Sequence, residues 1–264
     1  MTAQVICMAN FKGGVGKSTS AVNLAASLAF TGRRTLLADC DPQANASEMF
    51  IAEDDIEFDF RSVIAEGVPI DKAIRPTRIS GLDVLPASFG LALLDKELVI
   101  TPNGVQRIER ALRPVMGVYD DIVMDTGPNL SHLTLGALAA SQHIIIPVSA
   151  TVWGTKGLIK FIRWIDANRD DEVITAELLG LLATMVSPRT RIGRDVVQAM
   201  RDSPWPTFET TIPRRIRAED AVADRAVAGE PGVDQKFSEA YIEFSREVTA
   251  RLDRARKRGA HRAS

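Results

Sequence analysis

The segment between residues 12 and 19 carries residue types that bind a phosphate chain. Its glycines let successive backbone N–H groups converge on one point without a Cβ atom in the way. Lys17 is placed to reach the β- and γ-phosphates, and the hydroxyl of Ser18 is placed to ligate Mg²⁺. The whole segment reads Lys12-Gly13-Gly14-Val15-Gly16-Lys17-Ser18-Thr19.

The sequence on either side of this segment predicts the elements that hold it. An apolar run at residues 5–9 precedes it, and a helical pattern of small and apolar residues at 21–29 follows it. A strand, a glycine-rich loop and a helix in this order aim the positive end of the helix dipole at the loop. This context indicates a nucleotide phosphate site.

The front of the loop departs from the ordinary phosphate-loop pattern. Phe11 stands where a glycine is usual, and Lys12 adds a second lysine. Because Lys17 already serves the phosphates of its own loop, Lys12 is a catalytic candidate that reaches phosphates held by a partner subunit. The alternative is a solvated lysine on a mobile loop.

Three aspartates that follow predicted strands are candidates for metal binding and water activation. Asp125 ends an apolar run, where a nucleotide site places a carboxylate that contacts Mg²⁺, often through water. Asp39 and Asp41 stand one residue apart after another strand, and two close carboxylates favour a cation or an activated water between them. Asp41 is the candidate that orients or deprotonates the attacking water. The alternative for each aspartate is a role in the following turn.

Two clusters of arginines predict a surface that contacts phosphate backbones. Few acidic residues interrupt them, and Asp195 is the nearest. Such a surface binds DNA without reading bases. The alternative is a solvated face paired with nearby acids. The clusters comprise Arg189, Arg191 and Arg194, and Arg214, Arg215 and Arg217.

Composition bounds the class of protein. The 264 residues are 45% hydrophobic and carry a net charge of −2, so DNA binding requires a local basic patch. Two cysteines form neither a disulfide framework nor a zinc motif, which fits a reducing cytosol. Neither a signal peptide nor a membrane-spanning run is expected.

Short apolar runs alternate with helical patterns along the chain. Runs that are apolar on both faces predict an α/β fold, with a mostly parallel twisted sheet and helices on both faces. We expect one domain over residues 1–253 and a flexible basic tail over 254–264. Beyond residues 5–9, strands are expected at 34–38, 82–86, 121–125, 143–148, 178–185 and 208–212, and helices at 104–116, 158–168, 193–201 and 237–256.

With these residues placed, the chain resembles the ParA family of partition ATPases, in the deviant-Walker group of P-loop NTPases that also contains MinD. The resemblance makes Lys12 the signature lysine, Asp41 the hydrolytic aspartate and Asp125 the Mg²⁺-linked aspartate. Two later segments, Thr184-Met185 and Ile212-Pro213-Arg214, are similar to family motifs beside the nucleotide, which implies cofactor contacts for Met185, Pro213 and Arg214. DNA contacts are implied for Arg189 and Arg217.

Three positions and one short segment differ from the usual family pattern. Ala44 replaces a glycine, Gly136 replaces an asparagine and Arg215 replaces an asparagine. The segment after Asp125 reads Thr126-Gly127-Pro128-Asn129 instead of Pro-Pro-Ser. No segment long enough for an operator-binding domain precedes the first predicted strand.

The resemblance implies a cytoplasmic, nucleoid-associated ATPase that uses ATP and Mg²⁺. We expect an ATP-sandwiched homodimer that binds non-specific double-stranded DNA, with hydrolysis stimulated by a ParB-like partner during plasmid or chromosome segregation. The alternatives are a MinD-like membrane-cycling ATPase, a positioner of non-DNA cargo and, least favoured because a Cys-x-x-Cys pair is lacking, a metal-cluster carrier.

Overall fold

The computed structural model describes residues 2–150, 154–187, 190–215 and 224–262. These residues form one sheet of eight strands in the order β3-β4-β2-β5-β1-β6-β7-β8. Neighbouring strands are parallel except for β3 and β4, which confirms the predicted mostly parallel sheet. The strands are β1 (Gln4–Met8), β2 (Thr35–Cys40), β3 (Arg75–Pro76), β4 (Leu82–Leu85), β5 (Asp121–Thr126), β6 (His143–Ser149), β7 (Glu177–Val186) and β8 (Thr207–Pro213).

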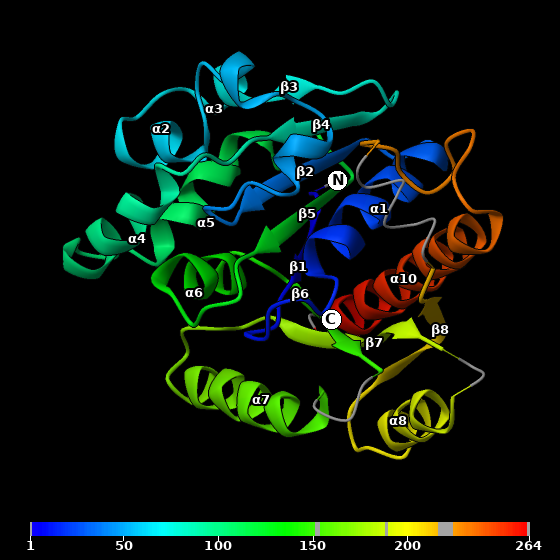
Figure 1. Ribbon diagram of the computed structural model, residues 1–264. Helices are drawn as coiled ribbons and strands as arrows, with labels where there is room; N and C mark the ends of the chain where they lie inside the picture. The colour runs from blue at the N-terminus through cyan, green and yellow to red at the C-terminus, as the bar shows by residue number, and fades with distance from the viewer. Residues whose placement is uncertain (1, 151–153, 188–189, 216–223, 263–264) are drawn as a thin grey trace.

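Helices cover both faces of the sheet (Figure 1). One face is covered by α1 and α10, and the other face by α2 and α4 to α8. The α-helices are α1 (Lys17–Phe30), α2 (Phe60–Ala65), α3 (Ile70–Ala73), α4 (Leu91–Ile100), α5 (Gln106–Leu112), α6 (His132–Ala139), α7 (Gly154–Asp170), α8 (Arg191–Arg201) and α10 (Gln235–Arg262). Single 3₁₀ turns are η1 (Ser47–Met49), η2 (Glu53–Asp55) and η3 (Arg113–Val115).

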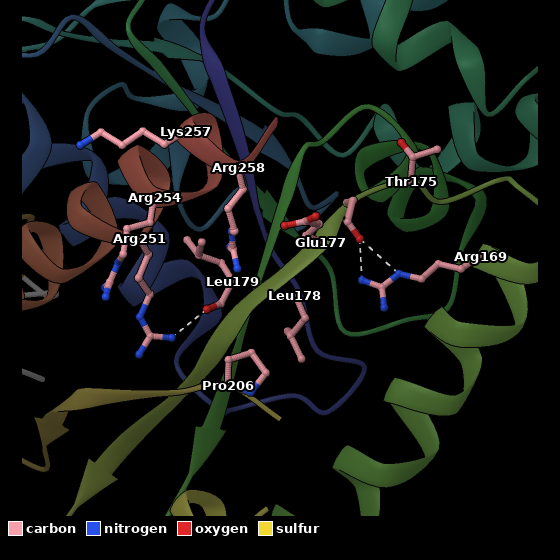
Figure 2. A pocket seen from close by; sticks show the side chains of 11 residues that line it. Arg169, Thr175, Glu177, Leu178, Leu179, Pro206, Arg251, Arg254, Lys257 and Arg258 are labelled. Carbon is pink, nitrogen blue, oxygen red and sulfur yellow. Dashed lines mark hydrogen bonds between the residues drawn. The ribbon is translucent and has the colours of Figure 1, made fainter. Parts of the chain in front are cut away.

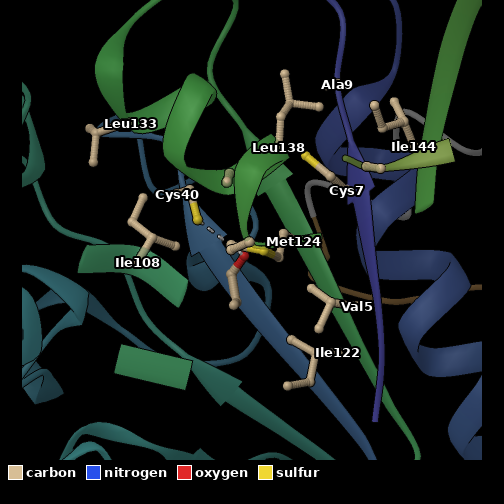
Figure 3. Close-up of a cluster of buried hydrophobic side chains, with 14 of the residues drawn as sticks. Val5, Cys7, Ala9, Cys40, Ile108, Ile122, Met124, Leu133, Leu138 and Ile144 are labelled. Atoms are coloured by element: carbon tan, nitrogen blue, oxygen red, sulfur yellow. Dashed lines mark hydrogen bonds between the residues drawn. The ribbon is translucent and has the colours of Figure 1, made fainter. Parts of the chain in front are cut away.

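The side-chain alternation of β1 shows why both faces are buried. Val5 and Cys7 point into the core under α5, α6 and α7, whereas Ile6 and Met8 point into the core under α1 and α10. Figure 3 shows the first of these cores, where Cys7 and Met124 lie near Leu138. A strand buried on both faces must be apolar throughout, as the sequence of β1 is.

The final helix docks into the core instead of exposing an apolar face. Tyr241, Phe244, Val248 and Leu252 are at most 2% exposed. They belong to the core that α10 shares with α1. In the described residues, no helix is long and apolar enough to cross a membrane.

Several elements differ from the sequence prediction. The short elements β3, α2, α3, α4 and α6 were not predicted as separate elements, since stretches of two to ten residues carry little periodicity. Helix α10 continues to Arg262, so the residues expected as a tail from Arg254 are helical as far as that residue. The predicted helix at 104–116 is divided into α5 and η3, with Pro114 inside the 3₁₀ turn.

Side chains of α10 hold the outer strand β8. The Glu247 carboxylate accepts hydrogen bonds from the backbone N–H groups of Glu209 and Thr210, both at 3.0 Å. Arg251 donates to the carbonyl oxygen of Thr207 at 2.6 Å. At the other edge of the sheet, β3 is two residues long and ends with Pro76.

Candidate nucleotide site

The sheet order brings the predicted phosphate-binding residues to one edge. Strand β1 lies between β5 and β6 in the sheet. The connection from β1 runs to β2 on one side of β1, whereas the connection from β5 runs in the opposite direction to β6 on the other side. Such a reversal opens a crevice at the carboxyl ends of the strands. Asp125 of β5 is in register with both Met8 of β1 and Asp39 of β2. The phosphate loop and the aspartate loops therefore meet there.

The phosphate loop needs its glycines for backbone conformation. Gly14 has a φ of 68° and Gly16 a φ of 81°, both in the left-handed region. A residue with a Cβ atom pays about 1–2 kcal/mol to adopt that region. Gly16 is the N-cap of α1, and this lets the helix begin at Lys17 and point its dipole into the loop.

Three side chains outside the glycine-rich segment fix the loop. Asn10 donates to the carbonyl oxygen of Pro147 at 2.8 Å and accepts from the Lys12 N–H at 3.0 Å. The hydroxyl of Thr184 donates to the carbonyl oxygen of Val15 at 2.8 Å. Phe11 packs edge-on against Phe161 of α7, with ring centroids 5.9 Å apart. Phe11 therefore anchors the front of the loop where other phosphate loops have glycine.

Lys17 is held inside the site. Lys17 is only 6% exposed, and its ammonium group donates a hydrogen bond to the carbonyl oxygen of Lys12 at 3.3 Å. Burial lowers the Lys17 pKa, whereas the charges of Asp125 and Asp41 oppose that change. A cavity of about 370 Å³ lies beside it, lined by Lys17, Ser18, Thr19, Asp41 and Pro128 among others.

Asp125 fits the role of a Mg²⁺-linked carboxylate. It is fully buried, and neither carboxylate oxygen accepts a hydrogen bond of ordinary geometry. Burial raises the Asp125 pKa well above its usual range, as does the charge of Asp39, whereas the nearby Ser18 hydroxyl lowers it. Two unpartnered buried oxygens beside a serine hydroxyl suit a hydrated cation. Within the described chain, no three His, Cys, Asp or Glu side chains form a metal cluster, so phosphate oxygens and water must complete the coordination.

Asp39 accepts hydrogen bonds from the loop that follows β2. Its Oδ1 accepts from the Asp41 N–H at 3.0 Å, and its Oδ2 accepts from the N–H and hydroxyl of Ser47 at 2.9 and 2.7 Å. Burial raises its pKa to about 6, although the bonds from Ser47 and Asp41 lower it. Asp39 therefore shapes the loop that carries Asp41, whereas both oxygens of Asp125 lack hydrogen-bond partners. A metal contact of Asp39 stays a prediction.

Asp41 lies against the loop that follows β5. Its Oδ1 accepts from the Gln43 N–H at 3.0 Å, and its carboxylate lines the same cavity as Lys17. A Cβ atom at position 127 would lie 3.2 Å from that Oδ1. Gly127, which departs from the family pattern, therefore leaves room for this carboxylate.

A second cavity of about 550 Å³ adjoins the loop on the side of β7 and β8. Met185, near the end of β7, has a positive φ of 53°, which is a strained conformation for a residue with a side chain. Its Cε would lie 3.9 Å from a Cβ atom added at Gly16. Cavities of a few hundred Å³ are the usual size for small-molecule sites. The predicted nucleotide contacts Lys12, Gly14, Gly16, Thr19, Met185, Pro213 and Arg214 line it.

The predicted DNA-contacting arginines lie in several environments. The Arg191 side chain is 89% exposed, and its Nε lies 3.4 Å from Asp195. Arg215 lies 3.5 Å from Asp234 and lines the second cavity with Arg214. Arg189 and Arg217 lie outside the described residues.

Sequence reasoning missed the supports of the site. Asn10 and Thr184 bind backbone on other elements, and Tyr241 of α10 lies 3.2 Å from the Ser20 hydroxyl of α1. Asn10 could have been found, because a buried polar residue between a strand and a phosphate loop must have partners. Nothing in the local sequence indicates the Tyr241 contact, which joins residues 221 positions apart.

Known proteins resemble this chain in sequence and in fold. A family model described as an AAA domain matches residues 3–176. The chromosome partitioning protein ParA of Myxococcus xanthus is 36% identical over 254 residues, which cover 94% of this chain and 88% of that protein.

Two solved structures extend the comparison. A putative plasmid partition protein of Borrelia burgdorferi bound to AMPPNP has a TM-score of 0.80 at 25% identity, over 96% of this chain and 99% of the other. Cobyrinic acid a,c-diamide synthase of Mycobacterium smegmatis, with an ATP analogue and magnesium, has a TM-score of 0.81 at 30% identity, over 92% of both chains.

Fold and site thus define a P-loop ATPase that uses ATP and Mg²⁺. Likeness to the Myxococcus protein extends over nearly the whole length of both chains. The chain belongs to the ParA family of partition ATPases.

Proposed function

We propose that this ATPase is a nucleotide-controlled switch that dimerises with ATP, binds DNA without sequence preference and positions plasmid or chromosome cargo. The observation that carries the proposal is the meeting of Lys17, Ser18, Asp41 and Asp125 around the phosphate loop, with Lys12 lining the adjoining cavity. This arrangement supports hydrolysis that one subunit alone does not complete.

Each residue of the site has a distinct task. The loop N–H groups and Lys17 hold the phosphate chain, while Asp41 orients the attacking water and accepts its proton. Ser18 and Asp125 would hold Mg²⁺, which would neutralise the charge that develops on the phosphates. Because Lys17 is buried and hydrogen-bonded to the Lys12 carbonyl oxygen, its side chain is already oriented before the phosphates bind.

Lys12 supports the dimer. Its ammonium forms no ion pair with any described residue, although its backbone is fixed by Asn10. A cation held at the mouth of the site and lacking a carboxylate partner is available to phosphates of a second subunit. Two copies related by a twofold axis each supply one such lysine.

The arginines of α8 and of the segment after β8 support the DNA-binding step. Arg191 is nearly fully exposed, and Arg214 and Arg215 lie beside the nucleotide cavity, so nucleotide state and basic surface are adjacent. Pairing two such surfaces in a dimer gains avidity that one surface lacks. Arg189 and Arg217 stay predictions that rest on the family resemblance.

A ParB-like partner that stimulates hydrolysis would complete the cycle and link it to cargo. Two relatives, a chromosome partitioning protein and a putative plasmid partition protein, support this assignment. The MinD-like alternative needs an exposed apolar face on the last helix, and the stripe of α10 is buried instead.

The test is binding to random-sequence duplex DNA with ATP, with ADP and without nucleotide, over a series of salt concentrations. We expect binding only with ATP, weakening steeply with salt. Arg191→Glu should weaken it at least tenfold, while Arg201→Glu, at the other end of α8, serves as the matched control. DNA binding that ignores the nucleotide would contradict the switch, and liposomes or a protein cargo would then be the partners to test.

A further inference from the structure

A basic cavity lies at the opposite edge of the sheet from the nucleotide site. Its volume is about 820 Å³, and it is lined where β7 and β8 begin and where α7 ends. Because these strands are parallel, their first residues are at the edge away from the phosphate loop. Figure 2 shows Arg169 reaching the cavity from one side and Arg251, Arg254 and Arg258 from the other.

The cavity carries more positive than negative charge. Five cationic side chains line it, with Glu177 as the lining carboxylate. Arg169 pairs with Asp166 at 3.3 Å and Arg251 with Glu247 at 2.7 Å. In the part of the chain that the structure describes, no ion pair joins the remaining three cations to a carboxylate. These are Arg254, Lys257 and Arg258.

One wall of the cavity is rigid. The Arg251 guanidinium lies 4.0 Å above the Phe208 ring and donates to the carbonyl oxygen of Leu179 at 2.8 Å. A Cβ atom at position 180 would lie 2.7 Å from Nη1 of Arg251 and 2.8 Å from the Phe208 ring. Gly180 thus provides the space in which the guanidinium and the ring are seated.

The helix dipole does not explain this grouping. Cations are favoured near a helix C-terminus, but the effect is confined to the last turn. Helix α10 ends at Arg262, so Arg254 lies two turns earlier, and Arg169 belongs to another helix. The cations are gathered around a hollow from two elements that are distant in sequence.

We propose that this basic cavity binds a small ligand with at least two phosphate groups, independently of the nucleotide site. Guanidinium groups bind phosphate oxygens in pairs, and three cations without ion pairs match a ligand with several negative charges. The volume lies within the range of small-molecule sites, and the lining cations come from α7 and α10, on either side of the strand starts.

The experiment is a calorimetric titration of the full chain with inorganic tripolyphosphate, after ADP and excess Mg²⁺ have saturated the nucleotide site. We expect one tripolyphosphate to bind per chain. Arg254→Glu combined with Arg258→Glu should weaken that binding at least tenfold, because it replaces two cations with carboxylates. Arg246→Glu is the control, since Arg246 is exposed on the same helix and is not among the lining residues.

Thermal unfolding of both variants shows first that they are folded. The proposal fails if the unmutated chain does not bind tripolyphosphate with its nucleotide site filled, or if the double variant binds it equally well. It also fails if the double variant loses only duplex DNA binding, because the cavity would then belong to a DNA surface. ATP affinity measured on the same proteins separates this result from any failure of the nucleotide site.

Discussion

At position 44 the backbone has a φ of 54°, in the left-handed region where glycine is favoured. This is the position at which the resemblance to the ParA family implies a glycine. Adopting the region with a side chain costs about 1–2 kcal/mol. The loop next to Asp41 is therefore strained by a single methyl group.

We expect Ala44→Gly to raise the free energy of unfolding by up to about 1 kcal/mol, because the relieved strain exceeds the added freedom of the unfolded chain. Urea unfolding of the two proteins measures the difference. A lower stability in the variant would mean that the partly buried methyl group contributes more by packing than it costs by strain.

A second prediction concerns the buried carboxylate of Asp125. We expect Asp125→Asn to weaken Mg²⁺-dependent ATP binding at least tenfold, about 1.4 kcal/mol. The melting temperature of the nucleotide-free protein should not fall, because burial already raises the Asp125 pKa and disfavours its charge.

Mg²⁺ titrations of ATP affinity at fixed pH provide the measurement. Asp39→Asn is the comparison, since both Asp39 oxygens are engaged within the chain and its loss should destabilise the Asp41 loop. Equal Mg²⁺ dependence in Asp125→Asn and the unmutated protein would remove Asp125 from the metal site.

At the scale of elements, Gly136 allows α6 to approach the segment before α5. A Cβ atom there would lie 2.8 Å from Cδ1 of Ile108 and 3.0 Å from the carbonyl oxygen of Val105. Any side chain at position 136 would therefore crowd the segment before α5. The two helices pack closely because one residue between them lacks a side chain.

Gly136→Ala should therefore lower the free energy of unfolding by about 1–3 kcal/mol through overpacking. Helix propensity alone would give the opposite sign, a gain of about 1 kcal/mol. Denaturant unfolding distinguishes the two effects. Gly117→Ala is the control, because a Cβ atom at position 117 meets nothing within 4 Å.

The sequence predicted every strand except β3 within two residues of its observed bounds. β1, β2, β5 and β6 are short apolar runs whose length and composition indicate strands buried on both faces. β3 has two residues and forms only because it pairs with β4. No pattern in its own sequence predicts that pairing. The packing of Phe11 against α7 likewise depends on Gly157, because a Cβ atom added there would lie 3.2 Å from the Phe11 ring.

At the scale of the whole molecule, the site could be predicted because parallel strands bring their carboxyl ends together. Asp39 and Asp125 lie at the carboxyl ends of β2 and β5, and Asp41 directly follows β2, so their meeting with the phosphate loop follows from the topology. The roles within the group could not be predicted, since the partners of Asp39 at Ser47 arise only after the loop folds back. The basic cavity was not predicted either, because it joins α7 to residues about 80 positions later.

A prediction at this scale tests the exchange of Lys12 between two subunits. Asp41→Ala should accumulate ATP-bound dimers, and adding Lys12→Ala should leave monomers, because the phosphates then lack the partner's cation. Light scattering after size-exclusion chromatography in ATP measures the mass. Lys72→Ala, an exposed lysine of α3, is the control in the same background. Dimers that persist without Lys12 would refute the exchange.

The two outer strands of the sheet are protected against pairing with strands of other chains. An open sheet offers unpaired N–H and carbonyl groups along its margins, which can template aggregation with another chain. Here one margin is a two-residue strand ending in Pro76, and at the other the Glu247 carboxylate occupies two successive N–H groups of β8. Many copies can therefore gather at high local concentration with little tendency to join strand to strand.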